Sequence, residues 1–190
     1  MVLKKADENT LVVFLISGGG SALLTCPHEG IMLAEKQAVT DLLLKAGADI
    51  QELNTVRKHI SAVKGGRLAE IAYPAKMISL ILSDVIGDPL DVIASGPTSP
   101  DTSTYADAMK VNNKYGLAAR MPESAIHILT SGAKGHIPET PKKDAPVFSG
   151  VDNIIIASNA MAVQAAKKQP NALDIKQPFS LRNSVVRHHK

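Results

Sequence analysis

"LVVFLISGGGSALL", residues 11–24, consists of six apolar residues, a serine and then three consecutive glycines, before a second serine and further apolar residues. A continuous apolar run rich in β-branched residues and bounded by turn residues is typical of a strand buried in a parallel sheet. Glycine loses more conformational freedom on folding than any other residue, so three in a row indicate a tight turn or a close approach to the backbone. The stretch therefore predicts a strand over residues 11–16 that ends in a loop with a special task.

Two other segments have the same character as this strand: "MISLIL", residues 77–82, and "VDNIIIA", residues 151–157. Helical patterns lie between the strands, and capping residues delimit them. These patterns cover residues 32–47, 50–66, 104–116 and 122–132, and a final helix is expected after Asn159. Strands that alternate with helices predict the α/β class, with a mainly parallel sheet and helices on its faces.

The composition argues against two classes of partner, nucleic acid and membranes, and indicates the redox compartment. The 190 residues carry a net charge of +3, and the terminal "RNSVVRHHK", residues 182–190, supplies that excess, so no basic face for nucleic acid is expected. No apolar run is long enough to cross a bilayer, so no membrane partner is expected. Cys26 is the only cysteine, which excludes an intrachain disulfide, favours a reducing compartment and predicts a small buried or half-buried thiol.

Polar residues follow each expected strand: "SGGGS" after the first, "SDVIGD" after the second and "SN" after the third. In open α/β sheets, ligands bind in the crevice beyond the carboxyl ends of the strands. Ordinary turns favour the same residue types, so a single loop of this kind decides nothing. Three such ends together favour a binding crevice.

The loop from Ser17 to Ser21 is the most specific of the three strand ends. Its glycines let backbone N–H groups converge on one concavity, which suits phosphate or carboxylate oxygens, and its serines add hydroxyl groups. The spacing matches neither the Walker loop nor the dinucleotide fingerprint. The loop by itself predicts only an anion site.

Basic residues surround a Gly-Gly break in "VRKHISAVKGGRLAE", residues 56–70. A solvated helix face explains most such runs. The functional alternative places Arg57 or Lys64 over an anionic substrate, because cationic groups neutralise the charge of a transferring phosphoryl group. His59 is expected to be a surface or packing residue.

Carboxylates are concentrated in "SDVIGDPLDVIASGPTSPD", residues 83–101. A carboxylate at a strand end beside a phosphate loop suits magnesium-dependent phosphoryl transfer, although Asp before Pro or after Gly is also ordinary turn chemistry. Asp84, which directly follows the strand, is the favoured ligand. Asp91 and Asp101 are expected to be structural.

Four motifs, "LISGGGSALL", "LNTVRKHISAVKGGRLA", "LILSDVIGDPLDVIASGPTSPD" and "IIIASNAMAV", occur in the order and approximate spacing of the class II glycerate kinases. The chain resembles this glycerate 2-kinase family from about residue 3 to about residue 181. The resemblance implies a Rossmann-like three-layer α/β/α domain. It also implies ATP-dependent and Mg²⁺-dependent phosphorylation of D-glycerate to 2-phosphoglycerate.

The resemblance also suggests roles for individual residues. It implies catalytic roles for Lys64, Asp84 and Arg57, with Asp84 also holding Mg²⁺. It implies phosphate or substrate contacts for Ser17, Gly18, Gly19, Gly20, Ser21, Asn54, Asp88 and Asn159. The expected partners are D-glycerate and ATP, in the cytoplasm, with a mitochondrial location and a homodimer left open.

The chain departs from the family pattern in two places, which affects the domain and the activity expected for it. The family implies an upstream segment with a catalytic lysine and a C-terminal domain with an active-site arginine, and neither is matched here. Residues 1–181 are therefore expected to form a partial, incomplete N-terminal domain, and residues 182–190 a divergent tail. The alternatives are a non-enzymatic fragment and a module that binds sugar phosphates or other anions.

Overall fold

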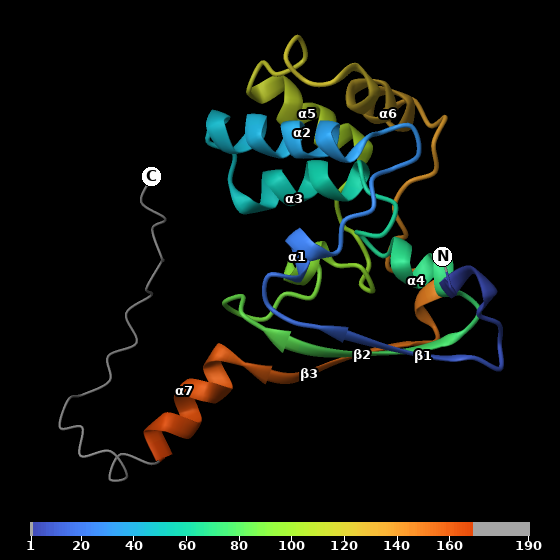
Figure 1. The fold of residues 1–190 in the computed structure, drawn as a ribbon, viewed down its shortest axis with the longest axis vertical. Helices are drawn as coiled ribbons and strands as arrows, with labels where there is room; N and C mark the ends of the chain where they lie inside the picture. Colours follow the sequence, from blue (N-terminus) through green and yellow to red (C-terminus); the bar gives the residue numbers. More distant parts are fainter. Residues whose placement is uncertain (1, 169–190) are drawn as a thin grey trace.

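Three parallel strands form the single sheet of the computed structural model, which describes residues 2–168 (Figure 1). They are β1 (Leu11–Ile16), β2 (Lys76–Ser83) and β3 (Val151–Ser158), in the order β1-β2-β3. Leu11 is paired with Lys76, and Met77 with Val151. The α/β class, the parallel pairing and the three strands predicted from the sequence are confirmed.

Helices connect the strands, at nearly the predicted positions. They are α1 (Gly20–Leu23), α2 (Leu33–Ala46), α3 (Ile50–His59), α4 (Arg67–Ala72), α5 (Tyr105–Lys114), α6 (Glu123–Ala133) and α7 (Asn159–Lys168). Short 3-10 turns lie at η1 (Val2–Lys5), η2 (Ile93–Ser95) and η3 (Pro146–Phe148). None of the helices within residues 2–168 is long and apolar enough to span a bilayer.

The helix expected over residues 50–66 is shorter than predicted, because α3 ends at His59. Directly beyond it, the N–H group of Ala62 donates to the carbonyl oxygen of Cys26, and the carbonyl oxygen of Ile60 accepts from the N–H group of His28, instead of continuing a helical ladder. Hydrogen bonds to a segment more than thirty residues away therefore end the helix, and no local pattern reveals them.

The largest hydrophobic core lies between helices, away from the sheet. Helices α2, α3, α5 and α6 stack in the upper part of Figure 1 and bury Val39, Leu43, Val56, Ala125 and Leu129 between them. Two smaller clusters cover one face of the sheet. They consist of Ile16, Ile81 and Ile93, and of Ala69, Ala72 and Met77.

The opposite face of the sheet is exposed. Burial alternates along β1, so that Leu15 is 72% exposed while the next residue, Ile16, is 6% exposed. Leu11 and Val13 lie on the same open face as Leu15, and Figure 1 shows no described helix beneath it. The described residues thus provide the sheet and one covering layer.

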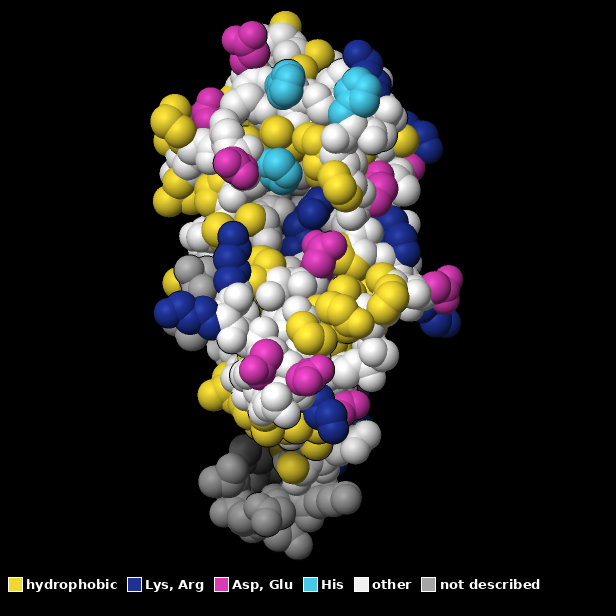
Figure 2. Space-filling view, turned by 90° about the vertical axis from the view of Figure 1, so that its right-hand side faces the viewer, with side chains coloured by type: hydrophobic (Ala, Val, Ile, Leu, Met, Phe, Trp, Pro, Cys, Tyr) yellow, Lys and Arg dark blue, Asp and Glu magenta, His cyan; other side chains and the backbone are white. Residues whose placement is uncertain are grey.

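Charged side chains of both signs are scattered over the face shown in Figure 2. Lysines and arginines alternate there with aspartates and glutamates, without a broad patch of one sign. This distribution agrees with the balanced charge of the sequence outside its last nine residues.

Candidate active site

The loops at the carboxyl ends of all three strands meet. Asp84, directly after β2, packs against the backbone of Gly18, which follows β1. Asn159, at the start of α7 after β3, donates a hydrogen bond from Nδ2 to the carbonyl oxygen of Asp84 at 3.3 Å. The structure therefore brings the three predicted loop segments to one end of the sheet.

Each glycine of the first loop has a different environment. A Cβ on Gly18 would lie 2.5 Å from Oδ2 of Asp84, which is closer than van der Waals contact allows. Gly19 has a φ of 74° and caps α1, whereas a Cβ on Gly20 would make an ordinary contact with Ala94. Within the described residues, the N–H groups of Gly18 and Gly19 donate to no other residue, so they are free to bind an anion.

Lys64 donates hydrogen bonds to this loop from the protein interior. Its side chain is fully buried, and its Nζ donates to the carbonyl oxygen of Ser21 at 3.0 Å, to the Ser21 hydroxyl at 3.1 Å and to the carbonyl oxygen of Ala94 at 3.0 Å. Burial, followed by the charges of Arg57 and Lys36, lowers the pKa of Lys64 to about 7. The ammonium thus joins the glycine loop to η2 and uses all three of its donors to do so.

A chain of hydroxyl groups continues from Ser21 into the interior. The hydroxyls of Ser21 and Ser95 lie 2.9 Å apart, and the Ser95 hydroxyl donates to Oδ1 of buried Asn54 at 2.9 Å. Ala94 and Ser95 have φ values of 52° and 62°, although neither is glycine. Such strain costs about 1–3 kcal/mol for each residue and is concentrated at functional sites. Asn54 therefore acts through Ser95 on the loop.

Arg57 reaches the same loop from α3. Its guanidinium donates to the carbonyl oxygen of Ser21 at 3.1 Å, and burial lowers its pKa. Neighbouring Lys58 and Lys64 are only 4% and 0% exposed. The structure therefore excludes a solvated helix face as the explanation of this basic run.

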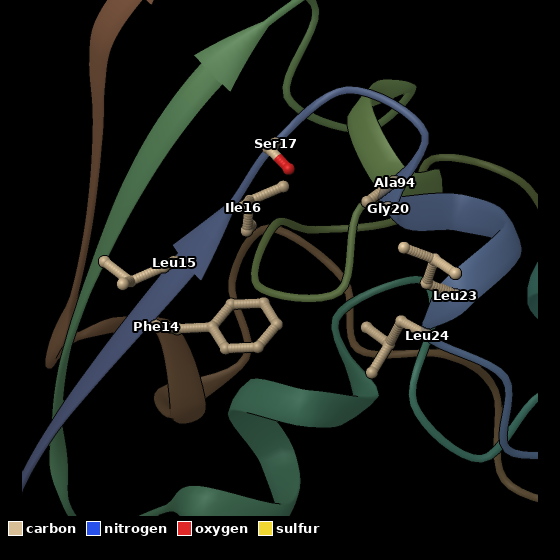
Figure 3. A pocket seen from close by; sticks show the side chains of 8 residues that line it. All are labelled: Phe14, Leu15, Ile16, Ser17, Gly20, Leu23, Leu24 and Ala94. Atoms are coloured by element: carbon tan, nitrogen blue, oxygen red, sulfur yellow. The ribbon is translucent and has the colours of Figure 1, made fainter.

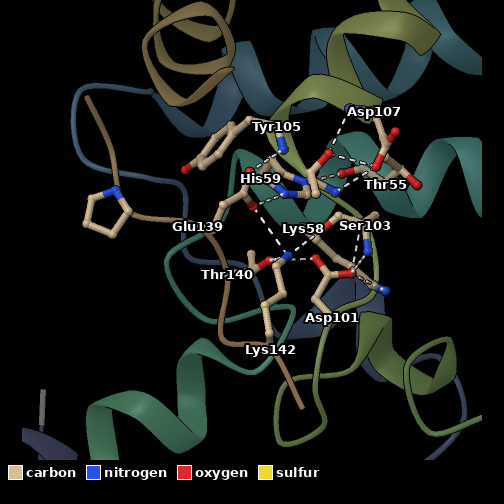
Figure 4. A network of polar contacts seen from close by, with 12 residues as sticks. Thr55, Lys58, His59, Asp101, Ser103, Tyr105, Asp107, Glu139, Thr140 and Lys142 are labelled. Atoms are coloured by element: carbon tan, nitrogen blue, oxygen red, sulfur yellow. Dashed lines mark hydrogen bonds and ion pairs between the residues drawn. The ribbon is translucent and has the colours of Figure 1, made fainter. Parts of the chain in front are cut away.

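Lys58 belongs to a buried polar network that joins α3 to the segments around Asp101 and Thr140 (Figure 4). Its Nζ lies 3.2 Å from Oδ1 of Asp101, which also accepts from the hydroxyl of Ser103, while Oδ2 accepts from Thr140. Asp91 lies 3.5 Å from the same ammonium. These contacts agree with the structural roles predicted for Asp91 and Asp101.

His59 faces away from the glycine loop, into the same network. Its Nδ1 lies 2.7 Å from the carbonyl oxygen of Thr55, its Nε2 lies 3.2 Å from Glu139, and its ring packs edge-on against Tyr105. Burial is the largest influence on its pKa, which it lowers. His59 is therefore a packing residue, as expected.

The acidic loop after β2 offers one carboxylate to the crevice. Asp84 is exposed and lies against the glycine loop, whereas Asp88 is half-buried and has a φ of 54°. No group of three or more metal-ligating side chains occurs within the described residues.

Cys26 is exposed, so the predicted buried or half-buried thiol is wrong. Its loop lies at the surface and is held by its carbonyl oxygen, which accepts hydrogen bonds from the Ser61 hydroxyl and the Ala62 N–H group.

An apolar hollow of about 310 Å³ adjoins the loop (Figure 3). It lies between the end of β1, α1 and η2, and the Ser17 side chain is its only polar one. The lining residues are Phe14, Leu15, Ile16, Ser17, Gly20, Leu23, Leu24 and Ala94.

Two residues near the loop were not singled out from the sequence. Ser95 lies within "ASGP" and has no local feature that marks it. Lys36 has a detectable signal, because it lies on the same face of α2 as buried Val39 and Leu43, where an apolar residue is expected.

Comparison with known proteins identifies the family. Residues 1–130 match the family described as "Domain of unknown function (DUF4147)". A protein named glycerate 2-kinase from Pyrococcus horikoshii is 46% identical over 175 residues, which is 92% of this chain and 39% of that protein. A D-glycerate 2-kinase from Thermotoga maritima is 59% identical over 116 residues, which is 61% of this chain and 28% of that protein.

A solved structure shares the fold. The crystal structure of a glycerate kinase from Thermotoga maritima aligns with a TM-score of 0.78 and 47% identity, over 89% of this chain and 38% of that chain. The chain thus spans less than half the length of the relatives it matches. The chain belongs to the DUF4147 family, and the names of these relatives confirm the resemblance to the glycerate kinases.

Proposed function

We propose that the chain phosphorylates D-glycerate to 2-phosphoglycerate with ATP as the phosphoryl donor. The observation that carries this proposal is the contact between Gly18 and Asp84, which sets free backbone N–H groups beside a carboxylate at the carboxyl ends of the strands. Phosphoryl transfer depends on positioned donors and cations around the phosphates. The names of the relatives supply glycerate as the acceptor.

The residues have distinct roles in this proposal. The N–H groups of Gly18 and Gly19 bind phosphate or carboxylate oxygens, and the hydroxyl of exposed Ser17 adds a donor beside them. Arg57 and Lys64 hold the loop through Ser21 and contribute positive charge behind it. The remaining residues of the site, Asn54, Asp88 and Asn159, position the loops.

The donor set around Asp84 fits Mg²⁺ bound together with a nucleotide. Mg²⁺ in phosphoryl-transfer sites takes one or two carboxylates from the protein and its other ligands from phosphates and water. Asp84 is exposed and adjoins the free N–H groups, so its carboxylate is available for this purpose. When bound, the cation neutralises the charge that develops on the phosphates. A cytoplasmic location, which the single cysteine favours, belongs to the same proposal, and a mitochondrial location and a homodimer are left open.

Turnover by the purified chain tests the proposal. ATP, Mg²⁺ and D-glycerate are supplied, and 2-phosphoglycerate is measured by mass spectrometry. Removing the carboxylate in Asp84→Asn should lower the rate a hundredfold or more, on the order of a lost transition-state contact. Asp152→Asn is the matched control, because Asp152 is exposed on the opposite face of the sheet.

Turnover that equals the rate of a Ser17→Ala, Asp84→Asn double variant would contradict kinase activity in this chain. Saturable phosphate binding without dependence on Mg²⁺ would then favour the alternative, a module that binds sugar phosphates or other anions. A rate that falls equally in Asp84→Asn and Asp152→Asn would remove Asp84 from the site.

A further inference from the structure

A second hollow, of about 220 Å³, lies between α1, α2 and α3 and is separate from the apolar hollow beside β1. Its lining is polar and charged on the side of α2 and α3. The lining residues are Ser21, Ala22, Thr25, Leu33, Lys36, Gln37, Thr40, Asp41 and Arg57.

Lys36 is the unusual member of this lining. The residue is only 5% exposed, and the only hydrogen bond of its Nζ within the described residues is a long one, 3.5 Å, to the carbonyl oxygen of Cys26. Buried lysines are almost always paired, because an unpaired buried charge is costly. Two of the three donors of Lys36 therefore lack a protein acceptor in the part of the chain that the structure describes.

Other cations approach the same place. Arg57 lines the hollow, and Lys64 lies just behind Ser21, which both cations contact. Across residues 2–168, no carboxylate lies within ion-pair distance of Lys36, Arg57 or Lys64. The only acid in the lining, Asp41, is exposed. The hollow thus has an excess of buried positive charge.

The pKa values reflect this excess. Burial, followed by the charge of Arg57, lowers the pKa of Lys36 to about 8. The charges of Arg57 and Lys36 also contribute to the lowered pKa of Lys64. A bound anion would offset the mutual repulsion of these three cations.

The size of the hollow limits the ligand. Pockets for drug-sized ligands occupy about 300–1,000 Å³. A hollow of about 220 Å³ is smaller, and it suits an inorganic anion or a three-carbon acid better than a nucleotide. Exposed Thr25 and Gln37 at its rim provide further polar groups.

We infer that the hollow between α1, α2 and α3 binds the carboxylate or phosphate group of a small molecule, with Lys36 and Arg57 as its cationic contacts. This inference holds whether or not the chain turns over a substrate. The bound molecule is either the acceptor substrate or a separate phosphate, because both carry the anionic oxygens that the cations would bind.

Calorimetric titration of the full chain with D-glycerate and with inorganic phosphate, in chloride-free buffer at pH 7, tests this inference. Glycerol serves as the uncharged control ligand. At least one of the two anions should bind saturably, and glycerol should not. Lys36→Met should weaken binding about tenfold or more, which is the size of a lost charge-assisted hydrogen bond. Lys36→Arg should retain most of it.

Two further variants keep the inference testable if Lys36→Met fails to fold. Lys45→Met removes an exposed lysine from the same helix and should leave binding unchanged. Asp41→Asn removes the exposed acid from the lining and should tighten binding about twofold to threefold, the scale of an exposed charge interaction. Phosphate binding alone would identify a separate phosphate as the occupant, and glycerate binding alone the substrate. Binding of neither anion, or equal binding by Lys36→Met and Lys45→Met, would overturn the inference, whether or not the chain has kinase activity.

Discussion

Gly18 and Gly20 differ in their environments although only one residue separates them. A Cβ at position 18 would meet the Asp84 carboxylate, whereas one at position 20 would meet Ala94 at an ordinary 3.6 Å. Because Asp84 is exposed and can rotate away, Gly18→Ala should cost no more than about 1 kcal/mol of stability. It should nevertheless lower the proposed turnover at least tenfold by displacing the carboxylate. Gly20→Ala should stay within twofold of the natural chain, and equal rates in the two variants would contradict this account.

Lys64 should make stability depend on pH. Its pKa is about 7 in the folded chain and 10.5 as the ordinary value expected after unfolding. Between these values the unfolded chain binds more protons, so the free energy of unfolding should rise with pH, and below about pH 7 the cost of the buried charge is fully present. The slope from this one group is at most about 1.4 kcal/mol per pH unit. Denaturant unfolding measured from pH 7 to pH 9 gives the slope.

The matched comparison for this pH dependence is Lys64→Met. That variant should be less stable overall, because the carbonyl oxygens of Ser21 and Ala94 lose their donor. Its stability should nevertheless change less between pH 7 and pH 9. Lys45→Met, which removes an exposed lysine, should keep the full slope. An unchanged slope in Lys64→Met would show that another group titrates.

At the scale of elements, the Lys58–Asp101 pair joins α3 to the segment before α5. Both side chains are buried, and Asp101 also accepts hydrogen bonds from Ser103 and Thr140. Asp101→Asn leaves the buried Lys58 with only the partly exposed Asp91 carboxylate, 3.5 Å away, so it should lower the free energy of unfolding by about 3 kcal/mol. The loss is measured by denaturant unfolding.

The double variant Lys58→Met, Asp101→Asn removes both charges of the buried pair. It therefore distinguishes the cost of an unpaired buried charge from the cost of the lost hydrogen bonds. It should recover part of the loss, because neither charge of the buried pair remains. Lys110→Met is the exposed control: its ion pair with Asp107 lies on the surface and should contribute less than about 1 kcal/mol. Equal losses in Asp101→Asn and Lys110→Met would contradict a buried pair.

For the whole molecule, the exposed face of the sheet is the dominant feature. Val13 and Leu15, which are 56% and 72% exposed, lie on it, whereas Ile16 packs on the covered face. Contiguous apolar surface of this kind promotes association. Val13→Lys with Leu15→Lys should therefore reduce self-association in sedimentation velocity and reduce binding of a hydrophobic dye. Stability should change little, by about 0.5 kcal/mol.

The contrasting variant is Ile16→Lys, which places the same charge on the covered face of the same strand. It should destabilise the fold by several kcal/mol, because a buried cation there has no partner. Similar stability losses from the two substitutions would mean that the alternation of burial along β1 is wrong.

The elements could be predicted well from the sequence because their signals are local. The apolar runs that form the strands, and the Asp49 cap that begins α3, depend on residues a few positions apart. The end of α3 could not be predicted in the same way, because the groups that bond to Ile60 and Ala62 there belong to His28 and Cys26, far away in the sequence. The sequence marked the glycine loop as a candidate anion site, whereas nothing in the sequence marked the strained Ser95, whose hydroxyl contacts Ser21 of that loop.

The amino-acid sequence by itself determined the α/β class, the glycine turn after the first strand and the order of the motifs that carry the family resemblance, since these depend on short-range propensity and pattern. Only the tertiary structure decided that Asp84 packs on Gly18, that Lys64 donates hydrogen bonds to the loop from the protein interior, and that Lys36 is buried with no carboxylate partner among residues 2–168. These properties depend on contacts between residues far apart in the chain. Burial sets the cost of each charge, and burial is a property of the assembled fold.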